Sequence, residues 1–485
     1  MLERILIVGA GEAGRILLSE FLRQGRAGAV AGFIDDDPAK KGEDFSGKSV
    51  LGSRSDIPAL VASLSITRAV IALPSASPEI IKETVSLLLS ADPDCAIEIL
   101  PPFTRYFETS LSSSLQNIRL TDIIEREEYS LDIAAIEHFF KGKRILITGA
   151  GGSIGSELCR QVSRFAPESV VCVGRGENSI YQLIRSIQDA GLDKQTAHIY
   201  KICDVKDAVL LEKIFSEFKP EIVFHAAAHK HVPLMEFNEA EALQNNVGGS
   251  NNVLKLSSKY QVERFVLVST DKAVNPVNIM GATKRITELL AGHYHRTNSL
   301  PAVVVRFGNV LGSRGSVIPL FRDQIEHGGP VTVTHPDITR FFMTIPEAVL
   351  LVLNAAAFSS GGETFVLNMG KQYRIDEIAR RMIRLYGLEP GRDIRIEYTG
   401  LRPGEKLYEE IIYGMEDLQP TTNEKIFIMK RKPDDMEDSL PSLLAELPKF
   451  AAMSPLEIRK RIQLAVKEFT WDENNIADTH SRMVR

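Results

Sequence analysis

The chain contains the pattern of strand, glycine turn and helix twice, and this pair of motifs constrains the fold more than any other feature. Residues 4–9 form an apolar run that leads into Gly9, Gly11 and Gly14, and apolar residues then recur at helical spacing. Residues 143–158 show the same order of features. Such turns join a parallel strand to a helix whose N-terminus can face a phosphate. The sequence therefore predicts an α/β chain with two Rossmann-like, doubly wound domains, the second carrying a smaller C-terminal substrate-binding subdomain.

Length and composition limit the classes of protein that remain. A chain of 485 residues can hold two or three domains that each bury a core. The net charge of −6 argues against nucleic acid as a partner, and four cysteines without a C-x-x-C pair are typical of a reduced protein. No run reaches the roughly 18 apolar residues of a membrane span. We therefore expect a soluble, cytoplasmic homo-oligomer, which could meet the inner face of the membrane through partners.

Changes in composition indicate the domain boundaries. Residues 105–140 pass from a serine-rich run to mixed polar and apolar residues, which is typical of a connection between domains. The predicted parts are a first Rossmann-like domain, a connecting segment, a second domain and a polar tail, in the order 1–128, 129–142, 143–470 and 471–485. The substrate-binding subdomain is expected mainly in 310–345 and 370–470.

The first glycine turn has two interpretations. The strand predicted at 29–34 ends in Asp35, an acid that could bind a ribose hydroxyl of a dinucleotide. Gly9, Gly11, Gly14 and Asp35 would then form a ligand site. Alternatively, the turn serves packing alone, because no set of catalytic residues follows it.

The second glycine turn predicts a dinucleotide cofactor more strongly. The strand at 169–173 ends in Gly174 and Arg175, where an NAD enzyme would carry an acid, and Arg175 could pair with the 2′-phosphate of NADP. The alternative for Arg175 is a solvated surface arginine. Small residues after the strand at 222–225 leave room for ribose and nicotinamide. The predicted cofactor contacts are Thr148, Gly149, Gly152, Ser153, Ile154, Gly155, Arg175, Asp204, Val205, Ala226, Ala227, Ala228 and Lys284.

Residues 268–288 bring together the groups that could carry out proton transfer. An apolar strand at 265–268 delivers Ser269, Thr270, Asp271 and Lys272 to its carboxyl end. A helix then presents Met280 and Lys284 on one face, four residues apart. A thioether cannot move a proton, so Asp271 and Lys272 are the ionisable pair available for acid and base chemistry.

Basic residues beside turns predict a site for an anionic substrate. Arg340, Arg402 and Lys406 have the charges that bind a diphosphate, although each alone could be a surface charge. His229 and His231 flank Lys230, but no third ligand stands at a zinc spacing, so no metal is predicted. The predicted substrate contacts are Lys230, His231, Asn309, Ser316, Val317, Arg340, Arg402, Glu405 and Lys406.

Taken together, these motifs resemble a known family. Residues 143–410 resemble the extended short-chain dehydrogenase/reductases that dehydrate nucleotide sugars. The resemblance is to the polysaccharide biosynthesis proteins of CapD/WbpM/PglF type, which carry an extra Rossmann-like domain ahead of the catalytic one. The motifs that carry it are T-G-A-G-G-S-I-G-S-E, A-A-A-H-K-H-V-P-L-M-E, S-T-D-K-A-V-N-P, M-G-A-T-K-R and R-P-G-E-K-L-Y-E-E. Many members also have N-terminal membrane helices, which this sequence lacks.

The resemblance implies a specific activity. It implies a lyase, a UDP-N-acetylglucosamine 4,6-dehydratase with a bound nicotinamide cofactor, and it points toward retention of configuration at C5. Gly174 and Arg175 depart from the family pattern and make NADP more expected than NAD. Asp271 and Lys272 would be the acid and base, Thr270 would hold the sugar and Lys284 the cofactor ribose. Met280 occupies the position where the wider superfamily has its catalytic tyrosine.

The implied mechanism places a demand on Lys272. This lysine can act as a base only when neutral, so its pKa has to be lowered, and we expect Lys284 and the positive nicotinamide to lower it. Two other functions stay open: a UDP-sugar 4-epimerase, which normally needs the tyrosine, and a non-enzymatic NADP-binding regulator, for which Met280 is the best argument.

Overall fold

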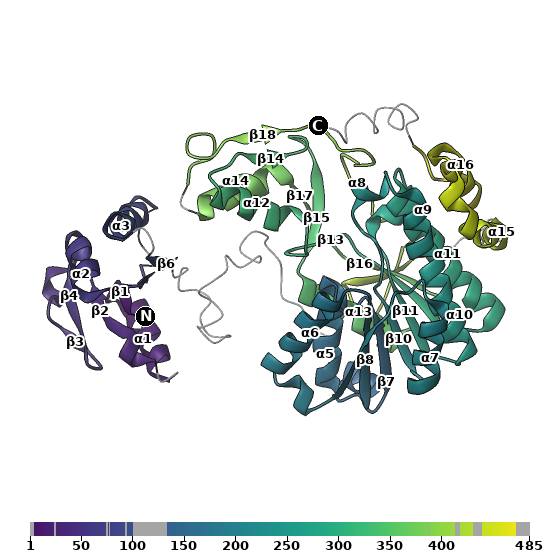
Figure 1. Cartoon of the computed structure of the whole chain (residues 1–485), viewed down its shortest axis with the longest axis horizontal. Helices are drawn as coiled ribbons and strands as arrows, with labels where there is room; N and C mark the ends of the chain where they lie inside the picture. Colours follow the sequence, from purple (N-terminus) through teal and green to yellow (C-terminus); the bar gives the residue numbers. More distant parts are fainter. Residues whose placement is uncertain are drawn as a thin grey trace. The chain divides into compact units, whose positions relative to one another are not determined.

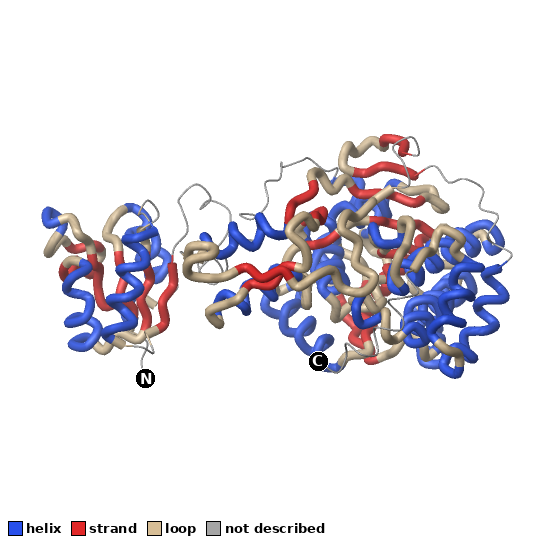
Figure 2. Tube along the Cα trace, turned by 90° about the horizontal axis from the view of Figure 1, so that it is seen from above, coloured by secondary structure: helices blue, strands red, loops and turns tan. Residues whose placement is uncertain are grey.

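The chain forms two compact units in the computed structural model, which describes residues 4–23, 26–73, 76, 78–92, 95–99, 133–386, 388–412, 418–429 and 439–471. The first unit comprises residues 1–123 and 381–394, and the second comprises residues 124–380 and 395–485. Strands lie between helices in each of them (Figures 1 and 2). The predicted connecting segment, 129–142, includes the helix α4 (Ile133–Phe140). The boundaries predicted for the four parts of the chain remain predictions. Residues 472–485, the predicted polar tail except for its first residue, lie outside the described residues.

The first unit is built on a six-stranded sheet with the order β3-β4-β2-β1-β5-β6. All neighbouring strands run parallel except β3, which is antiparallel to β4. Its helices and strands are β1 (Ile5–Val8), α1 (Glu12–Arg23), β2 (Val30–Ile34), β3 (Asp44–Phe45), β4 (Lys48–Gly52), α2 (Ile57–Leu64), β5 (Arg68–Ile71), α3 (Pro78–Ala91) and β6 (Ala96–Ile99).

The second unit is built on a nine-stranded sheet with the order β19-β20-β16-β12-β11-β10-β7-β8-β9. In this order across the sheet, the seven strands that begin with β16 and end with β9 run parallel to one another. Strand β20 pairs antiparallel with β16. The strands are β7 (Arg144–Thr148), β8 (Ser169–Gly174), β9 (Ala197–Ile202), β10 (Ile222–His225), β11 (Arg264–Val268), β12 (Ala302–Arg306), β16 (Thr364–Leu367), β19 (Leu418–Pro420) and β20 (Ile426–Met429).

Helices cover both faces of this sheet (Figure 1). Helices α4, α5 (Ser153–Val162), α6 (Glu177–Asp189) and α13 (Ile345–Phe358) pack on one face. Helices α7 (Ala208–Phe218), α10 (Gly249–Lys259), α11 (Ile279–Asn298), α15 (Ser439–Glu446) and α16 (Pro455–Ala465) pack on the other. Consecutive residues of β7 alternate between the two cores, Ile145 and Ile147 in one and Leu146 in the other, which explains why the strand is apolar throughout.

Two small sheets, built from segments that follow β12 and β16, form the subdomain beside the large sheet (Figure 1). One joins β13, β15 and β17, and the other joins β14 and β18. The elements of this part are β13 (Asn309–Val310), α12 (Val317–Glu326), β14 (Val331–Val333), β15 (Thr339–Met343), β17 (Gln372–Arg374), α14 (Ile375–Leu385) and β18 (Ile396–Tyr398). The short helices α8 (Val232–Met235) and α9 (Glu239–Ala242) follow β10, and a π-helical turn, 243–248, joins α9 to α10.

The predicted α/β class with two Rossmann-like sheets is confirmed. None of the helices within the described ranges is long and apolar enough to cross a bilayer.

Candidate active site

A cavity of about 890 Å³ lies at the carboxyl ends of the parallel strands of the second unit. The strand order reverses between β7 and β10, and the cavity is lined by residues that follow both strands. Parallel sheets bind ligands at such a reversal. The volume is sufficient for a ligand larger than a single sugar, since pockets for small molecules reach roughly 1,000 Å³.

The glycine turn after β7 forms a close-fitting cradle at this edge. Gly149 has a φ of +69°, and a Cβ added there would lie 2.7 Å from the backbone nitrogen of Ala227. A Cβ on Gly155 would lie 2.1 Å from the Gly149 carbonyl oxygen. The turn thus brings α5 close to β7, and Gly152 and Ser153 at the start of α5 line the cavity. The positive end of a helix dipole at this place suits the pyrophosphate of a dinucleotide.

All but one of the predicted cofactor contacts line the cavity: Gly149, Gly152, Ser153, Ile154, Gly155, Arg175, Asp204, Val205, Ala226, Ala227, Ala228 and Lys284. Thr148 is the exception. Its Oγ1 shares a hydrogen bond of 2.7 Å with Nδ1 of the buried His225, whose Nε2 meets Ser250 at 2.8 Å. Burial, with the nearby Lys284, lowers the pKa of His225 to about 3, so this imidazole is neutral. Thr148 therefore joins β7 to β10 beneath the cavity.

Arg175 lies at the edge of the cavity and is half-exposed. One guanidinium nitrogen lies 4.0 Å from Oε1 of Glu241. Glu241 accepts hydrogen bonds from Lys206 Nζ at 2.8 and 3.0 Å and meets His229 Nε2 at 3.0 Å. The sequence analysis missed this carboxylate, because it follows Arg175 by 66 positions and belongs to a different element.

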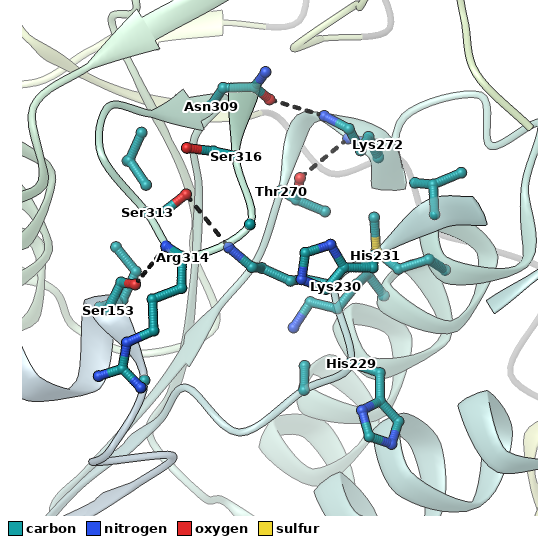
Figure 3. Close-up of a pocket in the computed structure, with 18 of the residues that line it drawn as sticks. Ser153, His229, Lys230, His231, Thr270, Lys272, Asn309, Ser313, Arg314 and Ser316 are labelled. Atoms are coloured by element: carbon teal, nitrogen blue, oxygen red, sulfur yellow. Dashed lines mark hydrogen bonds between the residues drawn. The ribbon is translucent and has the colours of Figure 1, made fainter. Parts of the chain in front are cut away.

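The strand end after β11 holds a hydrogen-bonded row of three side chains, Thr270, Asp271 and Lys272, of which Figure 3 labels the first and the last. Thr270 Oγ1 donates to Oδ1 of Asp271 at 2.9 Å, and Lys272 Nζ donates to the same oxygen at 3.0 Å. Lys272 Nζ also donates to Oδ1 of Asn309 at 3.1 Å. Thr270 caps the short 3₁₀ turn that follows the strand, which fixes the row locally. Thr270 and Lys272 line the cavity, while Asp271 is fully buried behind them.

The protonation of Lys272 differs from the expectation. Burial opposes its charge, but Asp271 and Glu409 outweigh this effect and raise the pKa of Lys272 above its usual value. The predicted lowering of this pKa by Lys284 is wrong for the protein without ligands. By contrast, burial reduces the pKa of Lys284 to about 8 despite the nearby Glu288.

Met280 and Lys284 lie on the face of α11 that lines the cavity. Lys284 Nζ donates to the carbonyl oxygen of Val268 at 2.6 Å, at the end of β11. The start of α11 is held twice: Asn278 Oδ1 accepts from the amide of Gly281 at 2.7 Å, and Glu236 Oε1 accepts from the amide of Ile279 at 2.6 Å. This double capping fixes the position of Met280.

Ser269 lines the cavity but its hydroxyl is already used. Its Oγ donates to Oε1 of Glu288 at 2.6 Å. Glu288 also binds the fully buried guanidinium of Arg306. Ser269 is therefore one member of a buried ionic cluster, with its donor directed away from any ligand.

On the substrate side, a glycine-containing loop lies against the cavity (Figure 3). Lys230 Nζ donates to Ser313 Oγ at 3.3 Å, and the amide of Arg314 donates to Ser153 Oγ at 3.2 Å. Gly315 packs so closely that a Cβ there would lie 2.6 Å from the ring of His231. Burial and the neighbouring Arg314 lower the pKa of Lys230. The predicted contacts Lys230, His231, Asn309, Ser316 and Val317 all line the cavity.

The three cations expected to bind a diphosphate have different surroundings. Arg340 and Arg402 line the cavity, and both contact Glu405, which lines it too. The guanidinium of Arg340 donates to three backbone carbonyl oxygens as well. Lys406 is not among the residues that line the cavity, because its Nζ donates to the carbonyl oxygen of Val274 at 3.1 Å.

Glu409 is a second candidate residue that was not predicted from the sequence. Its side chain is almost fully buried and lines the cavity. Oε1 lies 3.5 Å from Lys272 Nζ and 3.9 Å from Arg340 Nε. It belongs to the motif R-P-G-E-K-L-Y-E-E, but the motif does not tell which of its three glutamates faces the lysine.

The first unit uses its glycine turn largely for packing. A Cβ on Gly9 would lie 2.4 Å from a backbone oxygen of Ala72, and one on Gly14 would lie 2.0 Å from the Gly9 oxygen, whereas Gly11 has open space. Asp35 accepts a hydrogen bond from the amide of Ala10 at 2.8 Å and pairs with Lys40 at 3.0 Å. These partners occupy the carboxylate that was expected to bind a ribose, and the ligand site stays a prediction.

The fold and the site define a class of enzyme, the Rossmann-type nucleotide-sugar enzymes of the short-chain dehydrogenase/reductase superfamily. A family model described as polysaccharide biosynthesis protein matches residues 145–431. The capsular polysaccharide biosynthesis protein CapD of Staphylococcus aureus is 46% identical over 431 residues, which cover 87% of this chain and 70% of CapD. The chain belongs to this polysaccharide biosynthesis family, as the resemblance indicated.

Two further comparisons concern the whole length and the fold. The probable polysaccharide biosynthesis protein EpsC of Bacillus subtilis is 40% identical over 483 residues, 98% of this chain and 78% of EpsC, so the match includes the first unit. The dTDP-glucose 4,6-dehydratase DesIV of Streptomyces venezuelae, solved with NAD bound, is 21% identical with a TM-score of 0.51, and the match covers 64% of this chain and 97% of DesIV. The latter likeness shows the shared fold. The UDP-glucose 4-epimerase of Rickettsia canadensis is 37% identical over 285 residues, 58% of this chain and 80% of the epimerase.

Proposed function

We propose that this protein is a UDP-N-acetylglucosamine 4,6-dehydratase that retains configuration at C5 and uses NADP. The observation that carries the proposal is the row of Thr270, Asp271 and Lys272 at the end of β11, with Met280 where related enzymes place a tyrosine. An acid and a base at one strand end match the two proton transfers of a dehydration. A 4-epimerase has no use for this pair.

The residues divide the reaction between them. A nicotinamide cofactor, held by the glycine turn at 149–155 and Lys284, would supply the redox chemistry for oxidation at C4 of the sugar and reduction at C6. Thr270 binds the C4 hydroxyl and passes its proton to Asp271, to which it is already hydrogen-bonded. This relay replaces the missing tyrosine. Lys272 takes the proton from C5, which the new C4 ketone has made acidic.

Asp271 then acts as the acid for the leaving C6 hydroxyl. Its Oδ2 is buried without a hydrogen-bond partner among the described residues, and it lies beside Gly308, where a Cβ would come within 3.2 Å. Because Gly308 lines the cavity and has no side chain, a sugar can approach this oxygen. When Lys272 returns a proton to C5 from the side that it left, configuration at C5 is retained.

Incubation with UDP-N-acetylglucosamine tests the proposal. We expect a product lighter by the mass of one water, with a ketone at C4 that hydroxylamine traps. An epimerase would yield an isomer of unchanged mass, and a non-enzymatic regulator would leave the substrate unchanged. Either of these results would reject the dehydratase assignment.

We expect the protein to prefer NADP over NAD because of Arg175. A charge-assisted contact with the 2′-phosphate contributes about 1.5–3 kcal/mol, so Arg175→Ala should reduce the preference at least about tenfold. The nucleotide released from the denatured wild-type protein identifies the bound cofactor. Titration of the wild type and of Arg175→Ala with NADP and with NAD measures the preference between the two cofactors in each protein. Arg164→Ala, at an exposed arginine that does not line the cavity, is the matched control. Recovery of NAD alone from the wild-type protein would contradict the role of Arg175.

A further inference from the structure

Two buried carboxylates flank Lys272, whereas the proposed acid and base chemistry uses only one of them. Lys272 Nζ lies 3.0 Å from Asp271 Oδ1 and 3.5 Å from Glu409 Oε1. The remaining oxygen of Glu409, Oε2, is buried without a hydrogen-bond partner among the described residues. A buried carboxylate with an unpaired oxygen is costly to the folded state. Its presence beside the base therefore suggests a function.

The surrounding segment directs Glu409 toward Lys272. The carbonyl oxygen of Glu409 accepts a hydrogen bond from Gln372 Nε2 at 3.0 Å, and Arg340 binds the carbonyl oxygens of the two residues at 406 and 407. The adjacent Glu410 is half-exposed, accepts a hydrogen bond from Asn275 at 3.1 Å and lies 3.4 Å from Lys406 Nζ. Neighbouring glutamates in one segment thus have opposite environments.

The free protein poses a problem that Glu409 can solve. Lys272 forms an ion pair with Asp271, and its flanking carboxylates raise its pKa, so it starts the reaction protonated. A protonated amine cannot remove the C5 proton. The side chain is only 16% exposed, which leaves little access for water to take its proton.

We propose that Glu409 accepts the proton of Lys272, and so allows this lysine to act first as a base and later as an acid. The inference rests on the proposed dehydratase function and adds a residue to it. Glu409 does not touch the sugar in this scheme; it is a positioning residue that acts through Lys272.

The protons balance over the forward half of the reaction. At the start Asp271 and Glu409 are carboxylates and Lys272 is an ammonium. The C4 hydroxyl proton passes through Thr270 to Asp271, and an N–H bond of Lys272 breaks while an O–H bond forms on Glu409. The neutral amine then takes the C5 proton. Asp271 gives its proton to the C6 oxygen, which leaves as water.

The return half restores all three groups. As C6 is reduced, the ammonium of Lys272 gives its proton to C5, and Lys272 recovers a proton from Glu409. Asp271 and Glu409 are carboxylates again and Lys272 is an ammonium. One water has left the substrate, and no proton has been exchanged with solvent in net terms.

Glu409→Gln tests the inference through the pH dependence of the reaction. An amide cannot take the proton, so Lys272 has to lose it to solvent. We expect the rate of water loss near neutral pH to fall at least about 10²-fold and then to rise about tenfold per pH unit, because the neutral amine becomes more abundant. The wild-type rate should be flat over this range. A purely structural loss would lower the rate equally at every pH.

Two further variants complete the experiment. Glu410→Gln, the matched control, should keep the wild-type rate and profile. Glu409→Asp keeps a carboxylate and should therefore keep a flat profile at a reduced rate, which decides the question should the amide variant fail to fold. A flat profile in Glu409→Gln, or a tilted one in Glu409→Asp, would overturn the role of Glu409 while leaving the dehydratase intact. A wild-type protein that forms no product would overturn both.

Discussion

Lys272→Met is expected to slow the formation of dehydrated product at least about 10²-fold, the usual cost of losing a general base. Methionine has nearly the length of lysine but no basic nitrogen, so neither the removal nor the return of the C5 proton has a carrier. Cofactor binding should persist, because the glycine turn at 149–155 makes no use of Lys272. The content of bound nucleotide in the purified variant checks this point.

Heavy water distinguishes the role of Lys272 from that of Asp271. Wild-type product formed in heavy water should carry deuterium at C5, while C6 receives the hydrogen that was originally at C4. Lys272→Met should lose the exchange at C5. Asp271→Asn should also block water loss, because an amide is too weak an acid, yet still allow slow oxidation at C4, seen as absorbance of the reduced cofactor. Near-normal turnover in either variant would contradict the mechanism and favour the epimerase or regulator.

Local sequence patterns were sufficient for the fold and for the cradle of the cofactor. A glycine turn between a strand and a helix is a local feature, since Gly155 packs against the carbonyl oxygen of Gly149 in the same turn. The same holds for Thr270, Asp271 and Lys272, which are consecutive and therefore meet at one strand end. In such cases spacing along the chain determines proximity in space.

Partners distant in sequence could not be predicted in this way. Thr148 and Ser269 stand at positions expected to face a ligand, but His225 and Glu288 take their hydroxyls. The pKa of Lys272 rises rather than falls because Asp271 and Glu409 together outweigh the effect of burial, and Glu409 stands 137 positions later in the chain. Periodicity and motif spacing carry no information on which of several glutamates turns inward.

The second large effect is expected on stability, from the cluster beneath the active site. Glu288→Gln leaves the guanidinium of Arg306, which is 0% exposed, beside a neutral amide. Breaking one side of a buried ion pair costs about 3–5 kcal/mol in the free energy of unfolding. Arg285, which also contacts Glu288 at 3.4 Å, keeps its ion pair with Glu468 at 2.9 Å, so the cost is expected mainly at Arg306. The surface pair of Lys201 and Glu217, 3.3 Å apart, provides the control: Glu217→Gln should cost less than about 1 kcal/mol.

The single tryptophan makes this measurement specific for the second unit. Trp471 packs on Phe469 with ring centroids 5.2 Å apart, so its fluorescence during unfolding in urea reports on this unit alone.

Burial alone would raise the pKa of Glu288, but Arg306, with Arg285 and Ser269, lowers it to about 2 in the folded protein. The unfolded value is near ~4.3. The ion pair therefore contributes fully above that pH, and its contribution is lost as the pH falls toward 2. The difference in the free energy of unfolding between wild type and Glu288→Gln should therefore shrink as the pH falls over that interval. A difference that is already small at neutral pH, or that does not change with pH, would contradict a charged pair at this position.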